Sequence, residues 1–172
     1  VGKELDSLTD VISFGVAPAF IMYFWKLDTL GRFGWLLCLI YVICVALRLA
    51  RFNINSNQEP SWKDNFFEGV PSPAGGLIIL MPLIYELTEI DFNISVREYT
   101  PFLTIIIAVL LVSKIPTLSF KKISISSKAT IFLLLAVGMI FISLLFYTFE
   151  TLLVFSIVYL ISIPASILIY RN

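Results

Sequence analysis

The sequence predicts an all-α membrane protein, a polytopic helical bundle with six transmembrane helices in this chain. Of the 172 residues, 59% are hydrophobic and only 14% are charged, whereas soluble domains are roughly 45–50% apolar and about 25% charged. The apolar residues form long continuous runs, while transmembrane strands alternate over about ten residues. Helices are the structure that satisfies the backbone of such runs in lipid.

The spans follow one another along almost the whole chain. A membrane-spanning helix needs roughly 20 largely apolar residues, and five or six segments qualify. The fourth is short unless it continues past Lys114, and the last two are nearly contiguous, so they form a tight helical hairpin. The expected spans cover about residues 6–25, 30–53, 71–87, 99–113, 129–149 and 151–170.

Composition also excludes several kinds of function. The chain has 12 basic and 12 acidic residues, so it has no net charge to attract nucleic acid. It has no histidine, which excludes a Ser-His triad and a histidine general base from this chain. Its two cysteines, Cys38 and Cys44, lie in an apolar run and are interpreted as small buried hydrophobic residues.

The distribution of basic residues predicts the orientation in the membrane. With a cytoplasmic N-terminal end and six spans, nine basic residues lie on the cytoplasmic side and three on the other. Because cytoplasmic loops carry the excess of Lys and Arg, this orientation is favoured. The nine are Lys3, Arg48, Arg51, Lys63, Lys114, Lys121, Lys122, Lys128 and Arg171, and the three are Lys26, Arg32 and Arg97.

The first span carries two carboxylates on one face. Gly2, Asp6 and Asp10 are spaced by four residues, which places them along one side of a helix. With Asp6 at the cytoplasmic interface, Asp10 lies about 6 Å deeper, where a carboxylate costs up to about 3 kcal/mol. The cost favours a cation partner, a metal or proton transfer over simple solvation at a helix start. Gly15 and Pro18 predict a kink close by.

The second span and the loop after it bring further polar groups to the same side. Arg48 and Arg51 share a face near the cytoplasmic end, where they can bind phosphate or reach lipid headgroups. The loop DNFFEGVPSPAGG, with Pro71 and Ser72, can bring its backbone close to a ligand or simply start the third helix. Carboxylates suit Mg²⁺ or Mn²⁺, so carboxylates with arginines predict metal-assisted phosphoryl chemistry.

These residues resemble a known family. G-x3-D-x3-D, here Gly2, Asp6 and Asp10, is the second half of the CDP-alcohol phosphatidyltransferase signature D-x2-D-G-x2-A-R-x8-G-x3-D-x3-D. The segments SLTDVISFGVAPA, LRLARFN, FFEGVPSPAGG and VSKIPTLSFKK resemble the bacterial and archaeal membrane phosphatidylserine synthases. The resemblance covers residues 1–122, and the hairpin 128–172 resembles the extra helix pair of such enzymes.

The resemblance implies a function and roles for the candidate residues. The expected reaction transfers a phosphatidyl group from CDP-diacylglycerol to L-serine and releases CMP, at the cytoplasmic face of the cell membrane. It implies Asp6 and Asp10 as ligands of Mg²⁺ or Mn²⁺ and Asp10 as general base. It also implies a homodimer. The expected substrate contacts are Gly2, Arg48 and Arg51 for the nucleotide and phosphates, and Pro71, Ser72 and Lys114 for serine.

The resemblance also implies that the chain, a single membrane domain over 1–172, is truncated. The first half of the signature would lie before Val1, so about eight spans are expected in the full protein. Two alternatives stay open. A related transferase would use glycerol 3-phosphate or inositol phosphate as acceptor, and a membrane transporter or subunit would use the aspartates to carry ions, although transporters place such sites near the midplane.

Overall fold

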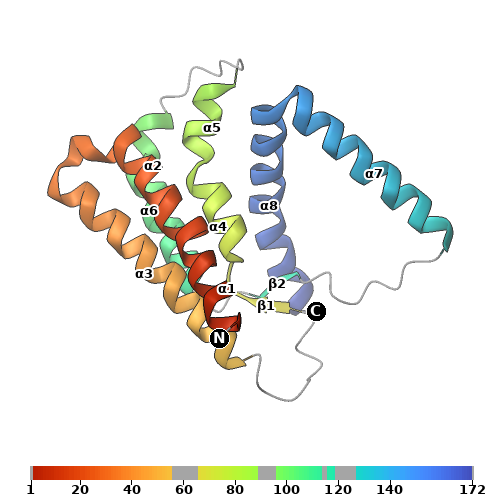
Figure 1. Ribbon diagram of the computed structural model, residues 1–172, viewed down its shortest axis with the longest axis horizontal. Helices are drawn as coiled ribbons and strands as arrows, with labels where there is room; N and C mark the ends of the chain where they lie inside the picture. The colour runs from red at the N-terminus through yellow and green to blue at the C-terminus, as the bar shows by residue number, and fades with distance from the viewer. Residues whose placement is uncertain (1, 56–65, 89–95, 114–115, 119–126, 172) are drawn as a thin grey trace.

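The computed structural model (Figure 1) describes residues 2–55, 66–88, 96–113, 116–118 and 127–171. Helices make up most of this part of the chain, which confirms the predicted all-α class. The α-helices are α1 (Gly2–Val11), α2 (Ala17–Trp25), α3 (Arg32–Asn55), α4 (Ser72–Ile79), α5 (Met81–Leu87), α6 (Val96–Val112), α7 (Ser127–Phe146) and α8 (Thr148–Arg171). Two three-residue strands, β1 (Phe66–Glu68) and β2 (Pro116–Leu118), pair antiparallel with Phe67 opposite Thr117.

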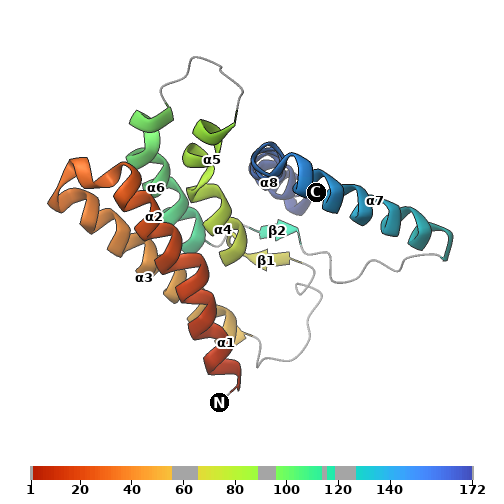
Figure 2. The same cartoon turned by 45° about the horizontal axis from the view of Figure 1, so that its top comes forward.

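The first span is a helix with an irregular middle. A π-helical segment, η1 (Ile12–Val16), joins α1 to α2, and a 3₁₀ turn, η2 (Leu27–Leu30), reverses the chain into α3. The two arms of this hairpin run antiparallel and pack along each other (Figures 1 and 2). The irregularity expected near Gly15 and Pro18 is therefore the π-helical segment.

The third predicted span, 71–87, is two helices rather than one. α4 ends at Ile79 and α5 begins at Met81, with Leu80 between them. Pro82 stands at the start of α5, where it has no N–H to give to the carbonyl of Ile78 and its ring crowds that turn. Pro82 therefore accounts for the break that periodicity alone did not predict.

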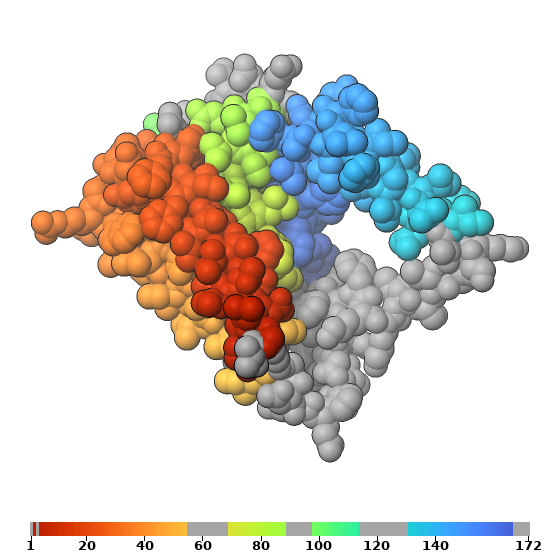
Figure 3. Space-filling view, viewed as in Figure 1, coloured from red at the N-terminus to blue at the C-terminus, as the bar shows by residue number. Residues whose placement is uncertain are grey.

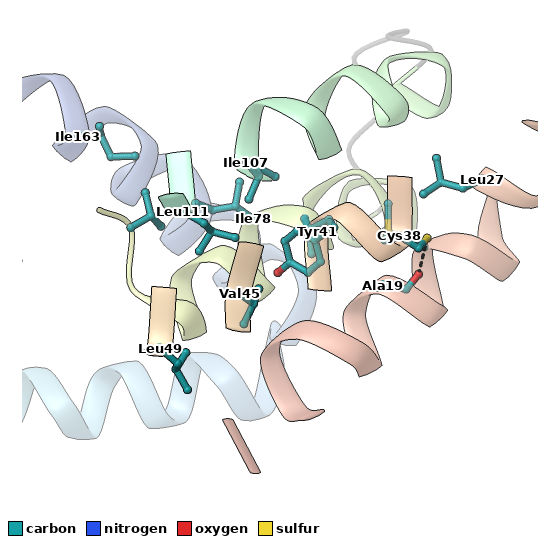
Figure 4. Close-up of a cluster of buried hydrophobic side chains, with 13 residues drawn as sticks. Ala19, Leu27, Cys38, Tyr41, Val45, Leu49, Ile78, Ile107, Leu111 and Ile163 are labelled. Atoms are coloured by element: carbon teal, nitrogen blue, oxygen red, sulfur yellow. Dashed lines mark hydrogen bonds between the residues drawn. The ribbon is translucent and has the colours of Figure 1, made fainter. Parts of the chain in front are cut away.

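The core lies where α2, α3, α4 and α6 meet. Tyr41, Val45, Ile78, Ile107 and Leu111 are each at most 1% exposed and pack in one cluster (Figure 4). Cys38 is buried in the same cluster, and its thiol donates to the carbonyl of Ala19 at 3.3 Å, which links α3 to α2. Both predicted small apolar cysteines are free thiols, Cys38 buried and Cys44 half-buried.

The last two helices form the predicted hairpin. α7 ends at Phe146 and α8 begins at Thr148, and the Ser143 and Thr151 hydroxyls hydrogen-bond across the turn at 2.7 Å. α8 packs against α4, α5 and β2, whereas α7 projects away from the other helices (Figure 3). Nearly all large apolar side chains from Ile131 to Phe146 are exposed, as expected of a surface that faces lipid rather than water.

Three helices of the described residues are long and apolar enough to cross a membrane. They are Glu4–Trp25, Arg32–Ile54 and Thr148–Ser166, of 22, 23 and 19 residues. The apolar helices Glu98–Val112 and Ile131–Phe146 are shorter, and the segment that contains α4 and α5 is broken. The chain is thus a helical membrane protein, and a count of six spans stays a prediction.

Candidate active site

A polar cavity of about 200 Å³ opens at the end of the bundle where the chain starts. Three segments far apart in the sequence form it: the acidic face of α1, the last turns of α3 and the start of α4. Figures 1 and 2 show these elements side by side near the N-terminus. The lining residues are Asp6, Ser7, Asp10, Arg48, Leu49, Phe52, Asn53, Pro71, Ser72 and Pro73.

The α1 wall presents the two predicted carboxylates. Asp6 and Asp10 stand one turn apart on α1 and both line the cavity. Asp6 is exposed and Asp10 is half-buried, in the order of depth that the sequence predicts. Carboxylates in this arrangement can bind a divalent cation, and the deeper one can accept a proton.

Arg48 faces these carboxylates from α3. Its Nη1 donates to the Oγ of Ser72 at 2.7 Å, and Ser72 is only 1% exposed. The Nε of Arg48 is buried with no hydrogen-bond partner among the described residues, and the guanidinium interacts electrostatically with Tyr159 and with Asp10. A held cation with an unused donor is suited to an anionic ligand, because charged donors bind phosphate and carboxylate oxygens strongly.

The chain before α4 places Ser72 by close backbone contact. Gly69 has φ +77°, and a Cβ there would lie 2.8 Å from the carbonyl oxygen of Ser113. Only glycine fits both the left-handed backbone and this approach to α6. Pro71 then caps α4, and its carbonyl accepts from the N–H of Gly75 at 2.9 Å, so Ser72 opens the helix under the Arg48 guanidinium.

The structure separates the other predicted residues from this cluster. The Nη1 of Arg51 donates to the carbonyl oxygen of Val112 at 2.8 Å, so Arg51 binds the carboxyl end of α6 and does not line the cavity. Gly2 is exposed at the start of α1 and is likewise absent from the lining. Lys114 lies outside the described residues. Asp6, Asp10, Arg48, Pro71 and Ser72 are brought together as predicted.

Two polar lining residues, Ser7 and Asn53, were missed in the sequence. The Nδ2 of Asn53 donates to the Oγ of Ser7 at 2.7 Å, which ties the end of α3 to α1 beside Asp6. Asn53 follows Arg48 by five residues, which is about 140° around an ideal helix, so helical spacing gave no signal for it. Ser7 gave no signal either, since one serine beside an aspartate is common at helix starts.

Two carboxylates of the cavity, Asp6 and Asp10, have the chemistry to bind a metal ion. Asp6 and Asp10 have the oxygen ligands and the spacing that a hard divalent cation uses. No group of three or more His, Cys, Asp or Glu side chains gathers to hold a metal in the ranges that the structure describes. Within these ranges the two aspartates fit such an ion as two of its ligands and do not complete a site by themselves.

A second cavity, of about 650 Å³, lies between α3 and α6 and is almost entirely apolar. Leu47 lines it, whereas the next residue along α3, Arg48, lines the polar cavity. The two cavities thus lie on different sides of the same turn of α3. The residues that line the apolar cavity are Leu37, Ile40, Cys44, Leu47, Thr104, Ile105, Ala108, Val109, Val112 and Ser113.

Comparison with known proteins gives consistent matches. The family model described as CDP-alcohol phosphatidyltransferase matches residues 1–168. Proteins named CDP-diacylglycerol–serine O-phosphatidyltransferase are similar to this chain in Mycobacterium leprae (38% identity over 73% of this chain and 42% of the relative), Helicobacter pylori (34%, over 93% and 65%) and Bacillus subtilis (36%, over 71% and 61%). The chain spans 42–65% of the length of these relatives.

Proposed function

The chain belongs to the CDP-alcohol phosphatidyltransferase family, and from this membership we propose that the full-length protein makes phosphatidylserine. It transfers the phosphatidyl group of CDP-diacylglycerol to L-serine and releases CMP. The observation that carries the proposal is one polar cavity that holds both aspartates of the family signature opposite Arg48 and Ser72. The choice of serine is supported by the names of the relatives.

Asp10 is the proposed general base. The serine hydroxyl forms a bond to the phosphorus that carries diacylglycerol, the bond from that phosphorus to the bridging oxygen breaks, and CMP leaves with the oxygen. The hydroxyl proton goes to the Asp10 carboxylate, the deeper of the two in the cavity. A base raises the rate because the neutral hydroxyl is a weak nucleophile.

The family generally depends on a divalent metal, and we propose Mg²⁺ or Mn²⁺ held by Asp6 and Asp10. When bound, such an ion neutralises negative charge that develops on the diphosphate. The other ligands are proposed to come from a segment before Val1 that carries the first half of the signature. The relatives are longer than the part that aligns with this chain, which leaves room for further ligands in a longer protein.

The remaining residues are proposed to bind the substrates. Arg48 binds a phosphate oxygen or the serine carboxylate through its unused Nε donor. Pro71 and Ser72 line the serine pocket with Lys114. Gly2 and Arg51, which do not line the cavity, are proposed to contact the nucleotide and its phosphates.

The apolar cavity between α3 and α6 is proposed to hold an acyl chain of CDP-diacylglycerol. On α3 its lining runs from Leu37 to Leu47, a length of about 15 Å, or half the hydrocarbon thickness of roughly 30 Å. The length of the cavity along α3 therefore matches the hydrocarbon thickness of one leaflet of the bilayer. Ala108→Phe, which fills the cavity, should raise the KM of long-chain CDP-diacylglycerol more than that of a short-chain analogue, and equal effects would contradict this placement.

The protein is proposed to be a multi-pass homodimer of the cytoplasmic membrane with the cavity on the cytosolic side. The charge asymmetry supports this orientation, because nine basic residues fall on that side and three on the other. The two substrates also fit such a position. Serine and the nucleotide enter from the cytosol, and the acyl chains stay in the bilayer.

Acceptor choice tests the proposal directly. The full-length protein, with CDP-diacylglycerol and Mg²⁺ or Mn²⁺, should release CMP with L-serine. It should use glycerol 3-phosphate and inositol 1-phosphate at least about 10- to 100-fold less well, because an acceptor that leaves a buried polar group unpaired costs about 1–3 kcal/mol. Turnover with a phosphate-bearing acceptor and none with serine would move the chain to another branch of the family. If none of the acceptors is used, an ion-carrying role would be favoured.

Asp10→Asn tests the base within the same assay. It should abolish turnover, while nucleotide-lipid binding is retained better than in Asp6→Asn, because a base acts only on the attacking hydroxyl. Asp28→Asn is the matched control, since Asp28 is an exposed carboxylate in η2, at the other end of α3. If Asp10→Asn and Asp28→Asn keep the same turnover, Asp10 is not the base.

A further inference from the structure

The π-helical segment lies directly between the acidic face of α1 and the core-facing side of α2. On the core side, Gly15, Pro18, Ala19 and Met22 are buried, and they mark the face that points into the bundle. Asp10 stands two residues before the segment begins. The register of η1 therefore sets the direction in which the carboxylates of α1 point.

The geometry of a regular helix shows how much this matters. At about 100° per residue, an uninterrupted α-helix would place Asp10 about 130° from the centre of the buried face. A π-bulge adds one residue to a turn, which rotates everything before it by about 100° relative to α2 and leaves Asp10 about 30° from that centre. Asp6 likewise moves from about 170° to about 70°. The bulge thus turns both aspartates from the outside of the bundle towards Arg48.

Two residues favour the bulge over a regular helix. Pro18 has no N–H for the carbonyl of Phe14, four residues earlier, and its ring would crowd that carbonyl in an α-helix. The hydroxyl of Tyr41 donates to this Phe14 carbonyl oxygen at 2.9 Å, and Tyr41 is 0% exposed in the core. A buried hydroxyl so placed donates to a carbonyl whose partner four residues later, Pro18, has no N–H to give.

α4 fits closely against the same segment. A Cβ added to Gly76 would lie 3.3 Å from the carbonyl oxygen of Phe14 and 3.4 Å from its Cα. The backbone of η1 is therefore in contact with α4, the helix that carries Ser72. Contacts from α3 and from α4 meet at one residue of η1.

We propose that the extra residue in η1 sets the rotation of α1 relative to α2, and that Tyr41 and Pro18 are positioning residues. Through η1 they turn Asp6 and Asp10 into the cavity without touching substrate. Tyr41 acts through the Phe14 carbonyl. The expected effect on turnover rests on the proposed function, whereas the rotation of α1 by η1 does not depend on it. That rotation gives Pro18 and the buried hydroxyl of Tyr41 a role beside the acidic face of α1.

The test uses the full-length protein and a register rescue. The double variant Pro18→Ala/Tyr41→Phe allows η1 to become α-helical, which rotates Asp10 away and should lower kcat about 100-fold, the size that a misplacement of 1 Å can cost. Deletion of Ser13, an exposed residue of η1, removes the extra residue and returns Asp10 to its face in a regular helix. Turnover should therefore recover in the double variant that lacks Ser13.

A second readout does not depend on activity. In a background with Cys38→Ala and Cys44→Ala, the pair Ser7→Cys and Asn53→Cys should be joined by a short thiol cross-linker, because these side chains are in contact. The yield should fall in the Pro18→Ala/Tyr41→Phe background and return on deletion of Ser13. If the wild-type protein transfers to no acceptor, the proposed function fails and the cross-linking still decides the register.

Controls separate positioning from stability. Tyr23→Phe makes the same chemical change near the other end of the bundle and should leave kcat unchanged. If the double variant is too unstable to purify, Pro18→Ala combined with deletion of Ser13 serves, since it removes both the extra residue and the proline that favours the bulge, and it should retain most of the turnover. Three outcomes would each overturn the proposal. Turnover could be lost in the Pro18→Ala variant that lacks Ser13, the double variant could keep normal kcat and cross-linking, or deletion of Ser13 could fail to rescue the double variant.

Discussion

Gly76→Ala tests how tightly the cavity depends on contact between α4 and η1. The added methyl would lie 3.3 Å from the Phe14 carbonyl oxygen, inside the 3.4 Å at which ordinary Cβ contacts begin. Its neighbours are backbone atoms of η1, which cannot rotate away as a side chain can. Overpacking of this kind costs about 1–3 kcal/mol, and alanine regains about 0.5–1 kcal/mol in a helix, so stability should fall by roughly 1 kcal/mol.

The effect on turnover should be larger than the effect on stability. A shift of a few tenths of an ångström at Phe14 is passed to Asp10, four residues before it on the same helix. Catalytic groups tolerate little displacement, so kcat should fall by about 10-fold or more while the protein still purifies folded. Steady-state release of CMP gives kcat, and thermal unfolding in detergent gives the stability.

Two other glycines provide matched controls for Gly76→Ala. Gly138→Ala in α7 meets nothing within 4 Å, so both stability and kcat should be retained. Gly75→Ala meets the Cδ2 atom of Leu111 at 2.9 Å, a flexible side chain away from η1, so it should alter stability more than kcat. A Gly76→Ala protein with the kcat of Gly138→Ala would refute the coupling between α4 and the aspartates.

Three further predictions follow from other contacts. Ser72→Ala removes the hydroxyl to which the Nη1 of Arg48 donates, which should raise the KM for serine or CDP-diacylglycerol by about 10-fold, at a cost of about 1–3 kcal/mol, in steady-state assays. Gly34→Ala puts a Cβ into the backbone carbonyl oxygen of Leu27, in the turn remote from the cavity, so thermal unfolding should show a larger loss of stability than for Gly76→Ala, with the kcat of the folded fraction unchanged. Cysteine introduced at Asn93 should be labelled from outside intact cells and cysteine at Ile125 should not, as the charge asymmetry predicts; the reverse pattern would place the cavity on the outer side.

Sequence patterns predicted the cavity because its main residues follow helical spacing. Asp6 and Asp10 share a face through their spacing of four, and Arg48 lies at the matching end of the antiparallel partner. The same reasoning treated Arg51 as equivalent to Arg48, because residues three apart lie only about 60° apart around a helix. In the folded chain, however, Arg51 binds the end of α6. Which of two neighbouring arginines faces a cavity depends on packing between helices, which spacing does not contain.

Backbone features were the hardest to predict. Pro18 and Gly15 indicated an irregular first helix, but not that it takes the form of an added residue. The form depends on Tyr41, 27 residues away in sequence, whose hydroxyl satisfies the Phe14 carbonyl. Similarly, Pro82 was visible in the sequence, yet the span 71–87 has enough apolar residues for one helix. The structure shows that this span is broken into α4 and α5.

The hydrogen bond between Arg48 and Ser72 has a consequence for the entropy of binding. An arginine side chain loses up to about 1.5–2 kcal/mol of rotamer freedom when it is immobilised. Because Ser72 already holds the guanidinium, this loss occurs when the protein folds and not when an anion enters. A substrate therefore meets a donor whose direction is set in advance, and preorganisation of this kind strengthens binding without any added contact. Changes that loosen the α3–α4 contact should first weaken the affinity for anions, before they unfold the bundle.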